Sequence, residues 1–288
     1  VLVAGDIVYE KGRASEYVKN FFSFWNSPAA PLMRSRMVVA APGNHDLEES
    51  WNLGDTPDGL AYFHTWSPPR NGPAGTQIPL HGPAADRTAF RAAAGDRFPG
   101  LANYSFDWGP VHWTVLDSSA HVDWMRPELR DWLTNDLRKA ERAWRFVVCH
   151  HAPFHSSQKH AEHQRMRVLA ELFEKNGVAV VFSGHVHNYQ RTHRIKFAPA
   201  RPGYGKDQRV PGRATKDPGG VTYVVSGAGG AGLHDKHLSG KPKDWQPFTA
   251  VFEANQHSFT LIDAEVKRVE IRQMGADGRE LDRFELTR

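Results

Sequence analysis

Residues 178–187 read VAVVFSGHVH, an apolar and β-branched run that stops at Gly184 and is followed by two histidines. A run of this kind is typical of a strand buried on both faces of a parallel sheet. In open α/β sheets, ligands gather at the carboxyl ends of such strands. His185 and His187 lie close together just past the end of the run, where their rings can face different directions. The pair therefore suits two adjacent metal ions better than one.

Three further apolar runs end in polar side chains. The stretch 1–10 reads VLVAGDIVYE, 37–46 reads MVVAAPGNHD, and 144–155 reads WRFVVCHHAPFH. We expect each run to be a buried strand with polar residues at its carboxyl end. The sequence thus predicts four strand ends that present these candidate side chains: Asp6, Tyr9, Asn44, His45, Asp46, His150, His151, His185 and His187.

Helical patterns alternate with these strands. Residues 126–142 carry apolar residues at helical spacing, and 166–177 end in a glycine that typically stops a helix. Alternating strands and helices predict parallel β-α-β units, whereas the C-terminal part is typical of antiparallel strands that close a second sheet. Pro/Gly-rich stretches at 67–86 and 197–220 are predicted to be surface excursions. Because no interdomain linker interrupts the pattern, residues 1–288 are expected to form one domain.

Composition limits the function classes. No apolar run reaches the roughly 18–20 residues of a membrane-spanning helix, and no signal peptide opens the sequence. The net charge is +4 and, apart from one loop, the basic residues are dispersed, so nucleic acid is not expected as a partner. The single cysteine, Cys149, excludes an internal disulfide. The oligomeric state stays open.

The side chains at the four strand ends are those that bind metal ions. Carboxylate, amide oxygen, phenolate and imidazole all ligate divalent or trivalent metals. A carboxylate such as Asp6 has two oxygens and can bridge two ions, and Asn44 adds no negative charge. Two ions about 3.5–4 Å apart can hold the attacking and leaving oxygens of an in-line displacement, which is the chemistry of phosphoryl transfer.

These segments resemble the signature blocks of the calcineurin-like metallophosphoesterases: GDIVY at 5–9, GNHD at 43–46, VCHHAPF at 148–154 and GHVHNYQRT at 184–192. Tyr9, with WSPPRNG at 66–72 and YSFDWG at 104–109, narrows the resemblance to the purple acid phosphatase branch. The resemblance implies a four-layer αββα sandwich of two mixed sheets. It also implies an enzyme that hydrolyses phosphate monoesters by direct attack of a metal-bound hydroxide. The substrates of this enzyme would be small-molecule phosphate esters.

The resemblance also implies a set of metal ligands. Asp6 would bridge two ions, iron(III) and a divalent ion (iron, zinc or manganese). Tyr9 and His187 would bind the iron(III). Asn44, His185 and one of the paired histidines would bind the divalent ion. We favour His150 for that last ligand, because Phe154 then lies four positions later, where the family usually has an aromatic residue. His151 is the alternative.

Other residues receive roles around that centre from the same resemblance. His45 would donate a proton to the leaving alkoxide or bond the phosphate, and Asp46 would either orient His45 or cap the turn. His160 would belong to the substrate pocket or be a solvent-exposed histidine, and exposure is expected for His155 and His163. Asp117 is expected to orient its neighbours. Arg191 and His193 are expected to form structural pairs.

One family block is not found. The resemblance places an Asp-x-Gly or Asp-x-His block, which supplies an aspartate to the iron site, before the strand that here begins at Val1. We therefore expect the catalytic domain to be N-terminally incomplete, without its first β-α unit. Two alternatives stay open, a phosphodiesterase of the same superfamily and a non-catalytic metal- or phosphate-binding domain. The resemblance also implies an extracytoplasmic or secreted protein.

Overall fold

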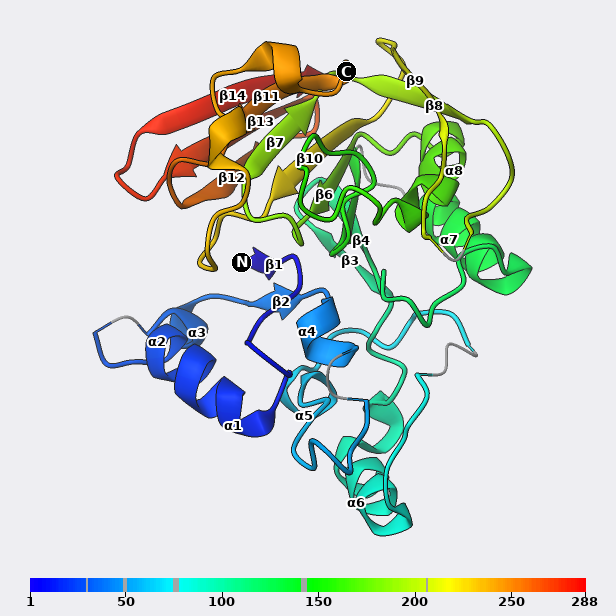
Figure 1. The fold of residues 1–288 in the computed structure, drawn as a ribbon, viewed down its shortest axis with the longest axis vertical. Helices are drawn as coiled ribbons and strands as arrows, with labels where there is room; N and C mark the ends of the chain where they lie inside the picture. Colours follow the sequence, from blue (N-terminus) through cyan, green and yellow to red (C-terminus); the bar gives the residue numbers. More distant parts are fainter. Residues whose placement is uncertain (30, 49–50, 75–77, 141–143, 206) are drawn as a thin grey trace. The chain divides into compact units, whose positions relative to one another are not determined.

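Strands and helices are mixed along the whole chain in the computed structural model (Figure 1). It describes residues 1–288 except 30, 49–50, 75–77, 141–143 and 206. The chain divides into two compact units. Unit 1 comprises Val1–Ser105 and Val115–Asp123, and unit 2 comprises Phe106–Thr114 and Trp124–Arg288. The α/β class expected from the sequence is confirmed.

Unit 1 contains a parallel pair of short strands and several short helices. Strand β1 (Leu2–Val3) pairs with β2 (Val39–Ala40). The sequence predicts a buried strand over residues 1–4, yet Val1 is exposed and the next three residues are half-buried. The reason is that, in the described part of the chain, the sheet of β1 has only two strands. The helices are α1 (Ala14–Glu16), α2 (Ser23–Trp25), α3 (Leu32–Ser35), α4 (Asn44–Leu47), α5 (Tyr62–Thr65) and α6 (Ala84–Ala94), with a π-helical segment at Tyr17–Phe22.

The end of β2 is fixed by two buried tyrosines. The hydroxyls of Tyr62 and Tyr104 lie 2.8 and 2.9 Å from the carbonyl oxygen of Ala40 and donate to it. All three residues are buried. Since buried hydroxyls must find partners, this carbonyl anchors α5 and the start of β3 to the strand that leads into residues 43–46.

Unit 2 is organised around a seven-stranded mixed sheet, ordered β11-β7-β10-β6-β5-β4-β3, whose last two strands extend into unit 1. The central strands β5, β6 and β10 are parallel, and β7 runs antiparallel between β10 and β11. The parallel units predicted from the sequence are thus present. Their bounds are β3 (Tyr104–Trp108), β4 (Val111–Leu116), β5 (Trp144–Cys149), β6 (Val180–Ser183), β7 (Tyr189–Thr192), β10 (Thr222–Ser226) and β11 (Thr249–Glu253).

Helices α7 (Pro127–Lys139) and α8 (Ala170–Lys175) complete the crossovers. Helix α7 buries Leu129, Leu133 and Leu137, which recur every four residues on one face. A 3-10 helix at Arg165–Leu169 precedes α8, so the predicted helix over 166–177 is shorter than its pattern. Figure 1 shows α7 and α8 on the opposite side of β6 and β10 from the C-terminal strands.

The remaining strands form two antiparallel sheets. Part of the stretch 197–220, predicted to be a surface excursion, instead pairs as the hairpin of β8 (Ile195–Pro199) and β9 (Gly212–Lys216). The C-terminal strands β12 (Ser258–Ala264), β13 (Arg268–Gly275) and β14 (Glu280–Thr287) form the second sheet expected from the sequence. That sheet is wholly antiparallel rather than mixed.

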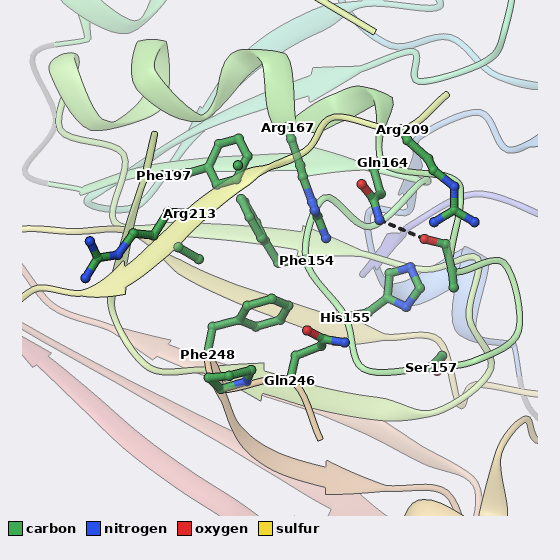
Figure 2. Close-up of a pocket in the computed structure, with 14 residues that line it drawn as sticks. Phe154, His155, Ser157, Gln164, Arg167, Phe197, Arg209, Arg213, Gln246 and Phe248 are labelled. Carbon is green, nitrogen blue, oxygen red and sulfur yellow. Dashed lines mark hydrogen bonds between the residues drawn. The ribbon is translucent and has the colours of Figure 1, made fainter. Parts of the chain in front are cut away.

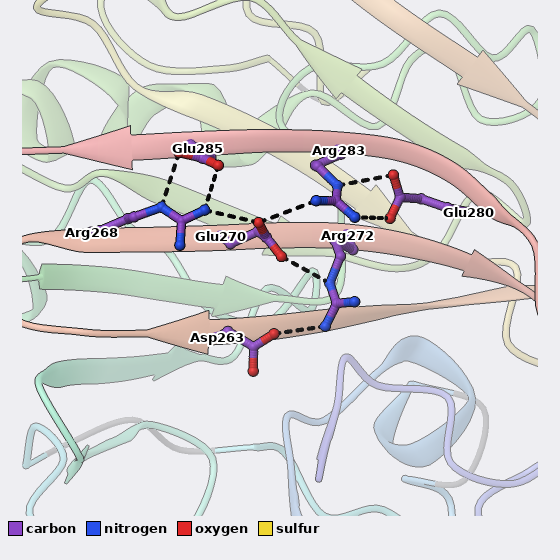
Figure 3. Close-up of polar contacts among 7 residues, drawn as sticks. All are labelled: Asp263, Arg268, Glu270, Arg272, Glu280, Arg283 and Glu285. Carbon is purple, nitrogen blue, oxygen red and sulfur yellow. Dashed lines mark hydrogen bonds and ion pairs between the residues drawn. The ribbon is translucent and has the colours of Figure 1, made fainter.

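One face of this C-terminal sheet carries a network of ion pairs (Figure 3). Glu270 on β13 lies 3.0 Å from Arg268, 3.2 Å from Arg272 and 3.4 Å from Arg283. Cross-strand pairs of opposite charge stabilise a sheet and fix its register.

No helix in the described residues has the length and apolar character needed to cross a membrane.

Candidate metal centre

In unit 1 the chain turns sharply after β1 and brings three candidate groups together. Asp6 has a φ of +52°, in the left-handed region that non-glycine residues rarely adopt. Its Oδ2 accepts a hydrogen bond from the Tyr9 hydroxyl at 3.2 Å, and its Oδ1 accepts one from the backbone N–H of His45 at 3.0 Å. Strain of this kind concentrates at functional sites.

Gly43 permits this close approach. A Cβ added at Gly43 would lie less than 3.0 Å from the Asp6 backbone nitrogen and carboxylate. Real Cβ atoms essentially never make such contacts, so the turn that carries Asp6 fits only against glycine. The glycine of the GNHD segment is therefore a packing requirement.

The segment after Gly43 forms α4, whose first residues are the candidates Asn44, His45 and Asp46. The Asp46 carboxylate is fully buried and accepts hydrogen bonds from the backbone N–H groups of Gly43 at 2.9 Å and Ile7 at 3.2 Å. These contacts are those of a turn cap that also ties the two candidate loops together.

His45 has a fixed ring orientation. Its Nδ1 lies 2.7 Å from the carbonyl oxygen of Glu10, and its ring centroid is 4.4 Å from that of Tyr9. Because a carbonyl oxygen can only accept, Nδ1 carries the hydrogen of that bond, and Nε2 is the nitrogen that can exchange a proton. Burial and the neighbouring Asp6 carboxylate raise the pKa of Tyr9 well above its ordinary value, so without a bound cation the phenol stays protonated.

Asp117, at the end of β4, lies in unit 1 and is fully buried. Its Oδ1 accepts from the N–H of Ser119 at 2.8 Å and from the Ser119 hydroxyl, and its Oδ2 lies 3.4 Å from Nε2 of His121. Burial alone would raise the pKa of Asp117, but bonds from His121 and Ser119 lower it. Asp117 thus contacts Ser119 and His121.

In unit 2 the ends of β5 and β6 deliver a group of buried imidazoles. His150, His151 and His185 are all buried, and the ring centroids of His151 and His185 are 4.3 Å apart. One nitrogen from each of His151, His163 and His185 lies within 4.8 Å of the other two. His150 also lies beside this group, with its ring centroid 5.1 Å from that of His185.

Burial keeps His151 and His185 neutral. It lowers the pKa of His151 well below the usual value, with further contributions from His185 and Arg165, and it lowers that of His185, with help from His150 and His160. Nη2 of the buried Arg165 lies 3.0 Å from Nε2 of His151. Neutral imidazole is the form that binds metal ions.

His187 and His160 lie at the edge of this group. The His187 ring stacks on that of His234 with centroids 4.0 Å apart. The backbone N–H of His187 donates to Nδ1 of His234 at 3.2 Å, and the backbone N–H of His234 donates to the His187 carbonyl oxygen at 2.9 Å. The His160 ring centroid is 4.3 Å from that of His185. His160 and His185 have φ values of +59° and +67°, two further strained positions at candidate residues.

The sequence interpretation missed or misplaced several histidines. His163 and His155 were expected to be exposed, but His163 is half-buried with its Nδ1 2.7 Å from Nε2 of His185, and His155 is only 6% exposed. His234 was not predicted at all. The one feature of the sequence that could have indicated the place of His163 was the His160-x-x-His163 spacing. The pairing expected for Arg191 is confirmed by its ion pair with Asp282 at 2.6 Å.

The donor set fits a metal site of the expected kind. Unit 1 offers a carboxylate beside a phenol, and unit 2 offers three imidazoles, those of His151, His163 and His185, within reach of one cation. Oxygen and nitrogen donors of this mixture suit iron, zinc and manganese. The candidate ligands divide between the units: Asp6, Tyr9 and Asn44 in unit 1, and His150, His151, His185 and His187 in unit 2.

Comparisons with known proteins agree with the motifs. A family model described as Calcineurin-like phosphoesterase matches residues 1–189. Purple acid phosphatase 18 of Arabidopsis thaliana is 25% identical over 87% of this chain and 47% of its own length. The phosphoenolpyruvate phosphatase of Allium cepa is 25% identical over 91% of this chain and 49% of its own. This chain therefore spans about half the length of these curated relatives.

A solved structure shows the same fold. The purple acid phosphatase PPD1 of yellow lupin superposes with a TM-score of 0.58 at 18% identity, covering 94% of this chain and 45% of that one. The resemblance to the purple acid phosphatase branch, inferred above from the four blocks and Tyr9, is confirmed by these matches.

Proposed function

The chain belongs to the calcineurin-like phosphoesterase family, and from this premise we propose that it is a metal-dependent phosphatase that hydrolyses phosphate monoesters. The observation that carries the proposal is the group of imidazoles at the ends of β5 and β6, in which His151 and His185 are buried and neutral. The names of the relatives, purple acid phosphatase and phosphoenolpyruvate phosphatase, support a monoester substrate. We propose that residues 1–288 act as one catalytic domain.

We propose a dinuclear centre of iron(III) and a divalent iron, zinc or manganese ion. When bound, the two ions would supply Lewis-acid activation of a water nucleophile and neutralise charge on the phosphate. His150 and His151 remain alternatives for one position, since both are buried beside His185. The proposed ligands are Asp6, Tyr9, Asn44, His185, His187 and one of that pair.

His45 would hold the proton for the leaving group. Its Nδ1 is engaged by the Glu10 carbonyl, so Nε2 is the atom that would deliver a proton to the departing oxygen. The hydrogen bond from its N–H to Asp6 fixes the backbone of the same residue. Asp46 would keep the two loops in register through its bonds to Gly43 and Ile7.

His160 would position the phosphate. Burial, with the charges of His163 and Lys159, lowers its pKa to about 4, so at neutral pH the ring is uncharged and can donate one N–H to a phosphate oxygen. Its ring is half-buried and lies against that of His185. Asp117 would act at a distance by orienting Ser119 and His121.

A paired assay tests this function. Purified protein with its metal content measured would be given an aryl phosphate monoester and the matching aryl phosphodiester. We expect faster turnover of the monoester, with two metal ions bound per chain. Faster turnover of the diester would favour the phosphodiesterase alternative. Two bound metals without turnover of either substrate would favour a non-catalytic binding domain.

Small-molecule phosphate esters are the proposed substrates, and nucleic acid is not expected as a partner, because the net charge is only +4. A secreted or extracytoplasmic setting is inferred from the family resemblance alone. Fractionation of the native host, followed by immunodetection of the protein, tests that setting.

A further inference from the structure

A cavity of about 430 Å³ lies within unit 2 (Figure 2). Its walls come from the loop after β5, the 3-10 helix Arg165–Leu169, the β8–β9 hairpin and residues 246–248 before β11. The volume is in the range of small-molecule sites. None of the proposed metal ligands lines it, so it is separate from the candidate metal centre.

Arg167 is the central charged group of this cavity. Nε of its guanidinium donates to the Pro153 carbonyl at 2.6 Å, and the group lies 4.8 Å from the centroid of the Phe154 ring. Burial lowers the pKa of Arg167 to about 10, which still leaves it charged at neutral pH. Among the described residues, no carboxylate lies within ion-pair distance of it. Its partners are two backbone carbonyl oxygens, those of Pro153 and Val210. A half-buried charge that meets only neutral oxygens is favourably completed by an anion.

His155 supplies a second, independent observation. Its side chain lines the cavity and is only 6% exposed, yet its Nδ1 is buried with no hydrogen-bond partner among the described residues. Figure 2 shows the ring among the labelled lining side chains. Buried polar atoms are nearly always satisfied in native proteins, so this nitrogen points to a ligand that completes the site.

The rest of the lining is mainly aromatic and basic. Phe154, Phe197 and Phe248 form aromatic walls, and Arg209 and Arg213 lie on opposite sides of Arg167 (Figure 2). None of the described lining residues is acidic. Arginine recognises planar carboxylates and similar anions through its fork of N–H donors, while aromatic rings favour a flat apolar body.

We propose that this cavity binds a small aromatic anion, such as an aryl carboxylate, with its anionic group at Arg167 and its ring against the phenylalanines. Nδ1 of His155 completes the hydrogen bonding of the bound molecule. The loop of residues 155–164, which also carries His160 and His163, supplies four of the lining residues.

Benzoate is the probe, with neutral benzamide as its matched comparison, and binding is measured by calorimetry on the metal-loaded full chain. We expect benzoate to bind at least about tenfold more tightly than benzamide, because charged hydrogen bonds are the stronger ones. Equal affinity for the two, or no measurable benzoate binding, overturns the proposal. This readout needs no catalysis, so it stands apart from the phosphatase assay.

Two variants locate the site. Arg167→Gln removes the charge, and Ala214→Phe fills the cavity from β9, where Ala214 is the cross-strand partner of Phe197. We expect each to weaken benzoate at least about tenfold. Arg201→Gln, an exposed arginine outside the lining, is the control and should change affinity less than about twofold. If Arg167→Gln does not fold, Ala214→Phe decides.

A competition arm separates this cavity from the metal centre, where carboxylates and phosphate can also bind. Vanadate, a phosphate mimic, is added to saturation before the benzoate titration. Unchanged benzoate affinity supports the proposal. Displacement of benzoate by vanadate, or loss of benzoate binding in His185→Ala but not in Ala214→Phe, overturns it, because the anion would then occupy the metal centre.

Discussion

Nδ1 of His163 lies 2.7 Å from Nε2 of His185, a hydrogen bond between two imidazoles from separate segments of unit 2. Burial and neighbouring histidines lower the pKa of His185 well below its usual value, so that ring is neutral. The bond therefore joins one ring as donor to the other as acceptor. It places a nitrogen of His163 where it can serve the same cation as His151 and His185.

Replacing His163 with alanine is expected to weaken metal binding by about 10–100-fold, the usual effect of losing a group that holds or orients a metal ligand. Elemental analysis of the protein after gel filtration measures the metal bound per chain. His237→Ala, an exposed histidine, is the control. A metal content equal to that of the unchanged protein would show that the His163–His185 bond belongs to the metal-free form alone.

Gly43→Ala should disturb unit 1, because the new Cβ would collide with the backbone and carboxylate of Asp6. We expect a loss of about 1–3 kcal/mol in the free energy of unfolding, as for other overpacked sites, together with lower metal content. Urea denaturation and elemental analysis measure the two effects. Gly229→Ala is the control, since its Cβ would meet nothing within 4 Å; equal effects of both variants would contradict the close-approach argument.

Much of the fold follows from local patterns. The apolar runs that end at Cys149 and Ser183 are β5 and β6, because strands buried in a parallel sheet need apolar side chains on both faces. Leu129, Leu133 and Leu137 predicted α7 because a helix places residues four apart on one face. The candidate donors at the strand ends were predictable because each of them follows directly on one of these apolar runs.

Other parts depend on contacts that no local pattern records. His163 and His234 lie in polar segments without periodicity, and His234 bonds to His187 through its ring and its backbone across 47 residues of sequence. The cavity around Arg167 likewise needs the β8–β9 hairpin, which Pro and Gly content predicts only as a loop. Strand β1 reads as buried from its composition, but burial depends on neighbouring strands rather than on its own residues.

His45→Ala should keep its metals while losing rate. If Nε2 of His45 protonates the leaving oxygen, turnover should fall by about 10²–10⁴-fold on an alkyl phosphate. The fall should be much smaller on p-nitrophenyl phosphate, whose leaving group needs no proton. Steady-state kinetics on both substrates, with elemental analysis, tests this. Loss of metal, or an equal fall on both substrates, would assign His45 a binding role instead.

The His112 side chain gives a pH dependence outside the candidate site. Burial alone would lower its pKa, but hydrogen bonds and charge from Asp136 at 3.0 Å and Asp107 at 2.9 Å raise it. A raised folded-state pKa gives stability that is fully present below the unfolded pKa of about 6.5 and is lost as pH rises through the folded value. Thermal melts from pH 5 to 9 should therefore show that the unchanged protein melts at a higher temperature than His112→Gln at low pH. This difference in melting temperature should shrink as pH rises, while the difference from the exposed-site control His237→Gln should show no such trend.

The arginine–glutamate network on β13 and β14 predicts a salt-dependent loss of stability. Glu270 accepts from Arg268 and faces Arg272 and Arg283 (Figure 3), so Glu270→Gln leaves three guanidinium groups with less opposing charge. We expect a lower melting temperature at 0.05 M NaCl and a smaller difference at 1 M, where the screening length is about 3 Å. Asp263→Asn, at a more exposed carboxylate that pairs with Arg272, should have a smaller effect. A deficit for Glu270→Gln that persists unchanged in 1 M salt would mean that packing, and not charge, is what this glutamate contributes.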